Sequence, residues 1–152
     1  MTTRTNPLGM LSPAERDRLL EFASEVTFPA GARIFEEGSR ADRFWIIHTG
    51  WVTLDVHVPG RRAAAVDTIG NGELLGWSWL IAPHTWQLGA EARSSVRALE
   101  FDAPAVRALC KEDPVLGQAL TRCVAEVVGN RLQSTRTRLL DLYGPQGSGP
   151  TR

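Results

Sequence analysis

The feature that most restricts the fold is a run of short apolar segments from Val26 to Phe101, each separated from the next by turn residues. In the segment from Trp51 to Val58, valines and a leucine alternate with Thr53, Asp55 and His57. This period of two is typical of a strand with one buried face. Many short strands at such spacing predict a roll, a barrel or a sandwich.

Glycine, proline and acidic residues divide this region into turns and strands. Phe28-Pro29-Ala30-Gly31, Glu37-Gly38-Ser39 and Pro59-Gly60 have the composition of tight turns, and a glycine-rich stretch covers residues 70–76. Between these turns the pattern predicts strands at residues 33–36, 44–49, 51–58, 61–69, 86–90 and 93–101.

Helical signals precede the strands. Ser12, Pro13 and Glu15 form a capping box with proline at the first helical position, and we expect a helix from there to near Glu25. Residues 1–11 are predicted to be a flexible arm.

A second group of helical signals follows the strands. Asp102 is expected to cap a short helix, and Asp113-Pro114 opens a long one that we expect to cover about residues 114–143. Gly144-Pro145 is predicted to end this helix, and the tail 144–152 is predicted to be disordered.

Length and composition narrow the class of protein. The 152 residues suffice for one domain with a sizeable core, and 17 basic side chains balance 17 acidic ones, so no general attraction to nucleic acid or acidic membranes is indicated. No segment approaches the ~18 apolar residues that a membrane span requires. Cys110 and Cys123 lie in helix-like stretches without metal-ligand spacing and are predicted to be reduced core thiols, as in a cytoplasmic protein.

Two glycine-containing motifs carry a family resemblance. The first runs from Phe28 to Gly38 and then from Asp42 to Val52, with a Pro-x-Gly turn, an acidic-Gly turn and a strand-breaking Gly50. The second is Gly72-Glu73-Leu74-Leu75-Gly76-x-x-x-Leu80. In this order they resemble the cyclic-nucleotide-binding domain of Crp–Fnr regulators, over about residues 12–143.

The resemblance implies an α+β fold: an antiparallel, jelly-roll-like β-roll with an N-terminal helix, a short helix and a long C-terminal helix. It also implies that the second motif is the entry to a phosphate-binding cassette. In members that bind a cyclic nucleotide, a Glu after the cassette Gly accepts a hydrogen bond from the ribose, and a later Arg pairs with the cyclic phosphate.

Both charged positions differ in this chain. Trp77 stands where the Glu is expected, and the Arg position falls on Trp86 or Gln87. A charged hydrogen bond contributes ~1.5–3 kcal/mol, so losing both predicts affinity lower by several decades. We therefore expect neither cyclic AMP nor cyclic GMP as a cofactor, unless Arg61 or Arg62 reaches into the cavity.

Three tryptophans, Trp77, Trp79 and Trp86, gather at the altered cassette and leave three interpretations open. They fill the former cavity, or they line an aromatic pocket for a flat ligand such as a nucleotide or dinucleotide, or they form an exposed patch for a protein partner. The candidate pocket residues are Gly72, Leu75, Gly76, Trp77, Ser78, Trp79, Trp86 and Gln87.

The long C-terminal helix carries an apolar seam that outruns a small roll. We expect its first part to cover the roll and its far part to form a homodimer, although a helix packed wholly on its own domain is the alternative. The seam residues are Leu116, Leu120, Val124, Val127, Val128, Leu132, Thr135, Leu139 and Leu142, of which Val124, Val128, Leu132, Thr135 and Leu139 are the candidate dimer residues. The last turns of this helix are basic, with Arg131, Arg136 and Arg138. The helix dipole favours cations near a helix C-terminus, and this explains the three arginines better than binding of nucleic acid does.

No signal for catalysis or a metal emerges. His48, His57 and His84 have no partner at metal-ligand spacing, and no cysteine near the N-terminus supports the iron–sulfur cluster of related oxygen sensors. The resembling regulators continue into a helix-turn-helix domain, whereas this sequence ends soon after Tyr143, so we expect no sequence-specific DNA binding.

The sequence thus predicts a non-enzymatic, cytoplasmic regulatory module with a degenerate cassette, acting through a protein partner such as an enzyme complex. One alternative is a sensor of a flat small molecule bound among the tryptophans. Another is a genuine cyclic-nucleotide-binding protein with an unusual phosphate contact.

Overall fold

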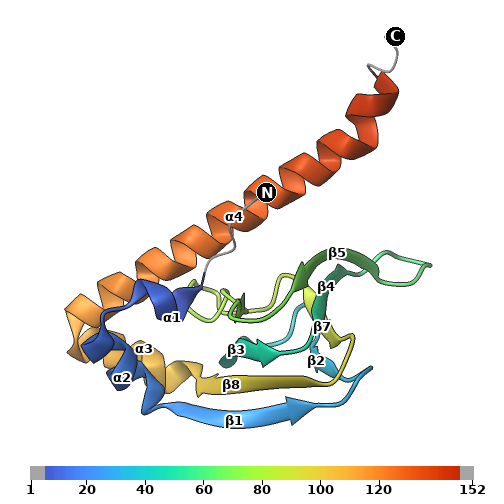
Figure 1. Ribbon diagram of the computed structural model, residues 1–152. Coiled ribbons are helices and arrows are strands. Elements are labelled where there is room, and N and C mark those ends of the chain that lie inside the picture. Colours follow the sequence, from blue (N-terminus) through green and yellow to red (C-terminus); the bar gives the residue numbers. More distant parts are fainter. Residues whose placement is uncertain (1–5, 148–152) are drawn as a thin grey trace.

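The computed structural model describes residues 6–147 and consists of two antiparallel sheets with helices on one side (Figure 1). The first sheet has the order β1 (Ala23–Phe28), β8 (Val96–Asp102), β3 (Arg43–Thr49) and β6 (Leu74–Leu75). The second has the order β2 (Arg33–Phe35), β7 (Gly89–Ala92), β4 (Val52–Val56) and β5 (Ala64–Ile69). The helices are α1 (Pro7–Met10), α2 (Pro13–Leu20), α3 (Ala103–Glu112) and α4 (Pro114–Gly147). The predicted α+β roll is confirmed.

Buried and more exposed residues alternate along the strands, and this explains why the two sheets enclose one core. On β4, Val52 and Leu54 are buried, and on β7 their neighbours Ala90 and Ala92 are fully buried. From the other sheet Trp45 of β3 reaches into the roll, where its ring stacks near that of Phe35 at a centroid distance of 5.7 Å. Small alanines opposite large rings let the two sheets approach closely.

The opposite face of the first sheet packs against the helices. Successive residues of a strand point to opposite faces, so Phe44 lies on this side and stacks on Phe101 of β8 and on Trp79. Helix α3 contacts both β3 and β8, and Val106 is buried there. The first half of α4 completes this layer, whereas its second half extends away from the strands (Figure 1).

The N-terminal expectations need two corrections. The capping box at Ser12 is present, but α2 ends at Leu20 rather than near Glu25, and residues 23–28 form β1, paired with β8. Half-buried Val26 and Phe28 alternate with exposed neighbours, a strand pattern that outweighs the local helix signal.

The expected arm of residues 1–11 is also partly ordered. Asn6 caps the short helix α1, and Pro7 and Leu11 are buried where α1 contacts α4. Residues 1–5 lie outside the described part of the chain.

At the C-terminal side, Asp102 and Asp113 cap as predicted, since each accepts a hydrogen bond from a backbone N–H three residues later. Helix α4 begins at Pro114 as predicted but continues to Gly147, past Gly144-Pro145. A proline inside a helix removes one hydrogen bond and its ring clashes with the carbonyl four residues earlier, so a helix that passes through a proline is kinked there. Residues 144–147, which were predicted to belong to the tail, thus lie in α4, and residues 148–152 lie outside the described range.

Among the strands, the main differences are β7, which begins at Gly89 rather than at Trp86, and the two-residue strand β6, which was not predicted. Two residues are too short to produce a periodic signal. Within the described residues, no helix is long and apolar enough to cross a membrane.

Candidate ligand site at the cassette

The cassette begins with a glycine that the packing requires. Gly76 follows β6 with a φ of +95°, and a β-carbon there would lie 2.5 Å from the ring of Trp86. After it, the backbone N–H groups of Leu80 and Ile81 donate to the carbonyls of Trp77 and Ser78, at 3.3 Å each. The segment thus forms two overlapping turns, held close to Trp86.

The cavity beside this turn is small. It has a volume of about 30 Å³, which is room for about one or two water molecules. Its lining comes from the cassette, the roll and α4: Phe35, Leu54, Gly76, Trp77, Ser78, Trp86, Gln87, Leu88 and Arg131.

Trp86 accounts for the small volume. Its side chain is only 5% exposed and stacks on Phe35 with a centroid distance of 3.9 Å and an interplanar angle of 13°. Its backbone is fixed from both sides, because Gly38 N–H donates to the Trp86 carbonyl and Trp86 N–H donates to the Ser39 carbonyl, both at 2.8 Å. Trp86 is therefore part of the roll interior rather than a movable cover.

The predicted pocket residues separate into two groups. Gly76, Trp77, Ser78, Trp86 and Gln87 come together around the cavity. Ser78 is a buried residue whose hydroxyl makes no hydrogen bond to the described residues, whereas the Gln87 amide donates to the Thr85 carbonyl at 3.3 Å.

Gly72, Leu75 and Trp79 do not line this cavity. Leu75 is fully buried in the core, and Gly72 lies near Asn6. Trp79 packs on the helical side, stacked on Phe44 at 4.1 Å, and its indole Nε1 has no hydrogen-bond partner among the described residues. Trp77 and Trp86 thus share the cassette cavity, whereas Trp79 packs in the layer beneath the helices.

Arg131 of α4 is a cavity residue, although its place in the sequence predicts only a basic side chain near the end of the helix. Its guanidinium donates to the carbonyl of Leu74, at the start of the cassette, and it lines the cavity. The available signal was its spacing, since Arg131 follows the buried Val127 by one turn and shares its face. The sequence does not predict its place at the cavity, because that place depends on the packing of α4 against β6, far away in the sequence.

The arginines considered for the cavity lie elsewhere. Arg61 and Arg62 are exposed in the turn between β4 and β5. Arg97 pairs with Glu25 at 2.9 Å and Arg93 with Glu91 at 3.7 Å, and neither lines the cavity.

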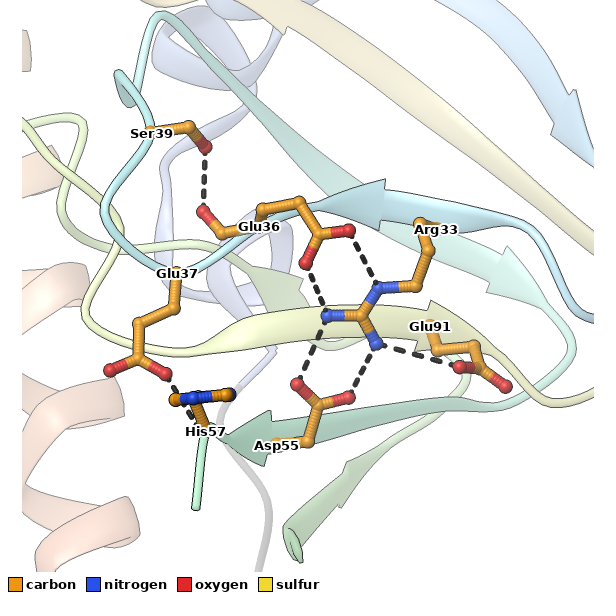
Figure 2. Close-up of polar contacts among 7 residues, drawn as sticks. All are labelled: Arg33, Glu36, Glu37, Ser39, Asp55, His57 and Glu91. Atoms are coloured by element: carbon orange, nitrogen blue, oxygen red, sulfur yellow. Dashed lines mark hydrogen bonds and ion pairs between the residues drawn. The ribbon is translucent and has the colours of Figure 1, made fainter. Parts of the chain in front are cut away.

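An ion-pair network centred on Arg33 lies on one face of the second sheet (Figure 2). The Arg33 guanidinium holds Asp55 with two hydrogen bonds of 2.6 and 3.1 Å, and also contacts Glu36 at 2.9 Å and Glu91 at 3.4 Å. Hydrogen bonds to Asp55 and Glu36 raise the pKa of Arg33 above its ordinary value. The network joins β2, β4 and β7, and every carboxylate in it is already engaged, so its role is structural.

The two cysteines are free thiols, as predicted. Burial, with Glu126 and Glu15 nearby, raises the pKa of Cys123 to about 11, and burial also raises the pKa of Cys110. Both therefore stay protonated at neutral pH. In the described part of the chain, no group of three His, Cys, Asp or Glu side chains is placed to hold a metal.

The sequence profile of the cyclic nucleotide-binding domain matches residues 25–113 of this chain. The chain belongs to this family. The match covers the roll and α3, and it includes every cavity residue except Arg131.

A curated relative of this cyclic nucleotide-binding domain is the CRP-like cAMP-activated global transcriptional regulator of Mycobacterium tuberculosis, which is 28% identical over 132 residues. The match covers 87% of this chain but 57% of the regulator, so the chain spans little more than half the length of its curated relative.

Two solved structures have the same fold and comparable identity. The N-terminal domain of a transcriptional regulator from Streptomyces coelicolor A3(2) is 28% identical with a TM-score of 0.68, covering 88% of this chain and 90% of that one. The Catabolite Activator Protein of Thermus thermophilus is 25% identical with a TM-score of 0.70, covering 91% of this chain and 63% of that one. The fold is thus that of Crp–Fnr regulatory domains.

Proposed function

We propose that this chain is a non-enzymatic regulatory module whose cassette no longer holds a cyclic nucleotide. The observation that carries the proposal is the cavity of about 30 Å³ beside Trp86. Small-molecule sites usually need roughly 300–1,000 Å³. A cyclic nucleotide does not fit unless Trp86 leaves its stack on Phe35.

The charges around the cavity support the same proposal. Trp77 and Gln87, which line it, are uncharged, so among the described lining residues the cavity has no carboxylate for a ribose and no cassette guanidinium for a phosphate. Two missing charged hydrogen bonds of ~1.5–3 kcal/mol each correspond to a loss of several decades in affinity.

Helix α4 is the element through which the module would act. Val128, Leu132, Thr135, Leu139 and Leu142 follow one another at intervals of 4, 3, 4 and 3, which is the spacing of a coiled-coil seam. Leu132, Leu139 and Leu142 are 65%, 51% and 58% exposed in the single chain. We propose that a second copy covers this seam and that the resulting homodimer binds a cytoplasmic protein partner, without DNA binding of its own.

A second candidate function has one specific observation in its favour. Arg131 places a guanidinium at the cavity, opposite the cassette that carries Ser78. A cyclic nucleotide bound with Trp86 displaced would meet this cation instead of a cassette arginine, which is the unusual phosphate contact of the alternative reading.

Calorimetric titration with cyclic AMP and cyclic GMP separates the two candidates. We expect no binding below millimolar ligand, because volume and charge are both missing. Micromolar binding by the wild-type chain would overturn the proposal, and its loss in Arg131→Gln would establish the second candidate.

A matched series of variants tests the physical reason. Trp86→Ala supplies volume without charge and should bind at most weakly. Adding Trp77→Glu and Gln87→Arg to it supplies both ionic contacts, and this triple variant should gain micromolar affinity. Equal affinities of the single and triple variants would show that charge is not what the cassette lacks.

A further inference from the structure

A second hollow lies on the other side of Trp86. Phe35 and Trp86 line both the cassette cavity and a hollow of about 320 Å³ between β1, β2 and β3, so their stack separates the two spaces. This volume is about ten times that of the cassette cavity and lies in the range of small-molecule sites.

The floor of the hollow is rigid and apolar. Trp45 and Phe35 are nearly fully buried beneath it, and half-buried Phe28 and Ile34 offer apolar surface to an occupant. Phe28 meets Trp45 edge to face at a centroid distance of 6.3 Å, so this half-buried ring is held in place by the core.

One wall of the hollow carries an internally balanced charge pair. Glu100 accepts a hydrogen bond from the Trp45 indole at 2.9 Å and pairs with Arg43 at 3.3 Å. The Glu100 side chain is 20% exposed, so this carboxylate is fixed by two partners and contributes no free charge to the hollow.

The rim carries two charges that are not balanced within the chain. In the described part of the chain, the side chains of Arg40 and Asp42 make no hydrogen bond or ion pair, either with each other or with other residues. Both line the hollow.

Their backbone is nevertheless fixed. Arg40 forms a β-bridge with Thr85, Ala41 N–H donates to the His84 carbonyl at 2.7 Å, and Ala103 N–H donates to the Asp42 carbonyl at 3.0 Å. A cation and an anion are thus presented from a preorganised loop, which lowers the entropic cost of binding.

We propose that this hollow binds a small zwitterion with a flat apolar group, of the chemical class of an aromatic α-amino acid. The carboxylate pairs with Arg40, the ammonium pairs with Asp42, and the ring lies against Phe28 and Ile34. The Asp42 carboxylate would repel a simple anion, and the Arg40 guanidinium would repel a simple cation. A ligand that carries both charges therefore fits best. This site is independent of the cassette and of the proposed dimer.

The test is a titration of the full chain with L-phenylalanine. Binding is measured by calorimetry and by the change in tryptophan fluorescence, to which Trp45 and Trp86 contribute. Two analogues each lack one charge: phenylalaninamide has no carboxylate, and 3-phenylpropionate has no ammonium. We expect L-phenylalanine to bind about tenfold more tightly than either, which corresponds to one charge-assisted contact of about 1.4 kcal/mol.

Two variants assign the contacts. Arg40→Gln should abolish the preference for L-phenylalanine over its amide, and Asp42→Asn should abolish its preference over 3-phenylpropionate. Neither side chain has a partner to lose, so both variants should fold, and Arg61→Gln, in an exposed turn away from the hollow, should behave as the wild type. Equal binding of the three probes, or no binding of L-phenylalanine at millimolar concentration, would overturn the proposal.

Discussion

Gly89 shows how one residue can determine whether a network of charges forms. A β-carbon at this position would lie 2.3 Å from Nη2 of Arg33 and 2.5 Å from Oδ1 of Asp55. The ion pair that joins β2 to β4 therefore passes directly over the bare backbone of β7 (Figure 2). The requirement for glycine here comes from close approach and not from an unusual φ.

We predict that Gly89→Ala lowers the free energy of unfolding by about 1–3 kcal/mol, because the added methyl group displaces Arg33 and leaves the mostly buried Asp55 without its cation. Chemical denaturation measures the change. The control is Gly129→Ala in α4, where a β-carbon meets nothing within 4 Å, and where alanine should stabilise the helix by up to about 1 kcal/mol. An unchanged midpoint for Gly89→Ala would mean that the Arg33–Asp55 pair contributes little.

The helices and strands differ in how far the sequence predicts them. Elements with a local chemical signal, such as the capping box at Ser12 and the aspartate cap before α4, begin where predicted. Elements defined by long-range pairing, such as β1 and β6, do not. The same distinction applies to the site, since Gly76 and Trp77 follow from a motif, whereas Arg131 enters the cavity only through the packing of α4.

The seam of α4 also predicts how two helices pair. If the helices are parallel with Leu132 at position a, Arg136 at position e lies on the same flank of the seam as Arg131 at position g of the second copy, whose guanidinium is held at the Leu74 carbonyl of its own chain. We predict that Arg136→Glu replaces two repulsive contacts with two attractive ones and tightens the dimer about fivefold, as sedimentation equilibrium at low salt would measure.

Arg138→Glu is the matched control, because it makes the same change of charge at a position that faces no arginine of the second copy. It should therefore tighten the dimer less than Arg136→Glu does. In an antiparallel pair, Arg136 of one helix faces Arg136 of the other, so Arg136→Glu only exchanges one pair of like charges for another. A dimer that Arg136→Glu fails to tighten would therefore exclude the parallel register. Val128→Asp together with Leu132→Asp should give monomers in either case.

The whole molecule divides into a packed body and a projecting helix. The buried residues of α4, which include Leu116, Cys123 and Val127, all precede Val128, whereas the large apolar residues beyond it are exposed. The roll, helices α1 to α3 and the first part of α4 therefore contain the core of the described residues, and the second part of α4 adds surface without adding burial (Figure 1).

We accordingly predict that a chain ending after Gln133 folds with nearly the thermal midpoint of the full chain but is monomeric, since it retains the core and Arg131 and loses most of the seam. Thermal unfolding and light scattering after gel filtration measure the two properties. Within this shortened chain, Arg131→Gln removes the bond to the Leu74 carbonyl. Its midpoint should fall by about 2–4 °C, for a loss of about 1 kcal/mol. A shortened chain that unfolds or aggregates would instead show that α4 pairing is needed to stabilise the roll, and the separation into body and projecting helix would not hold.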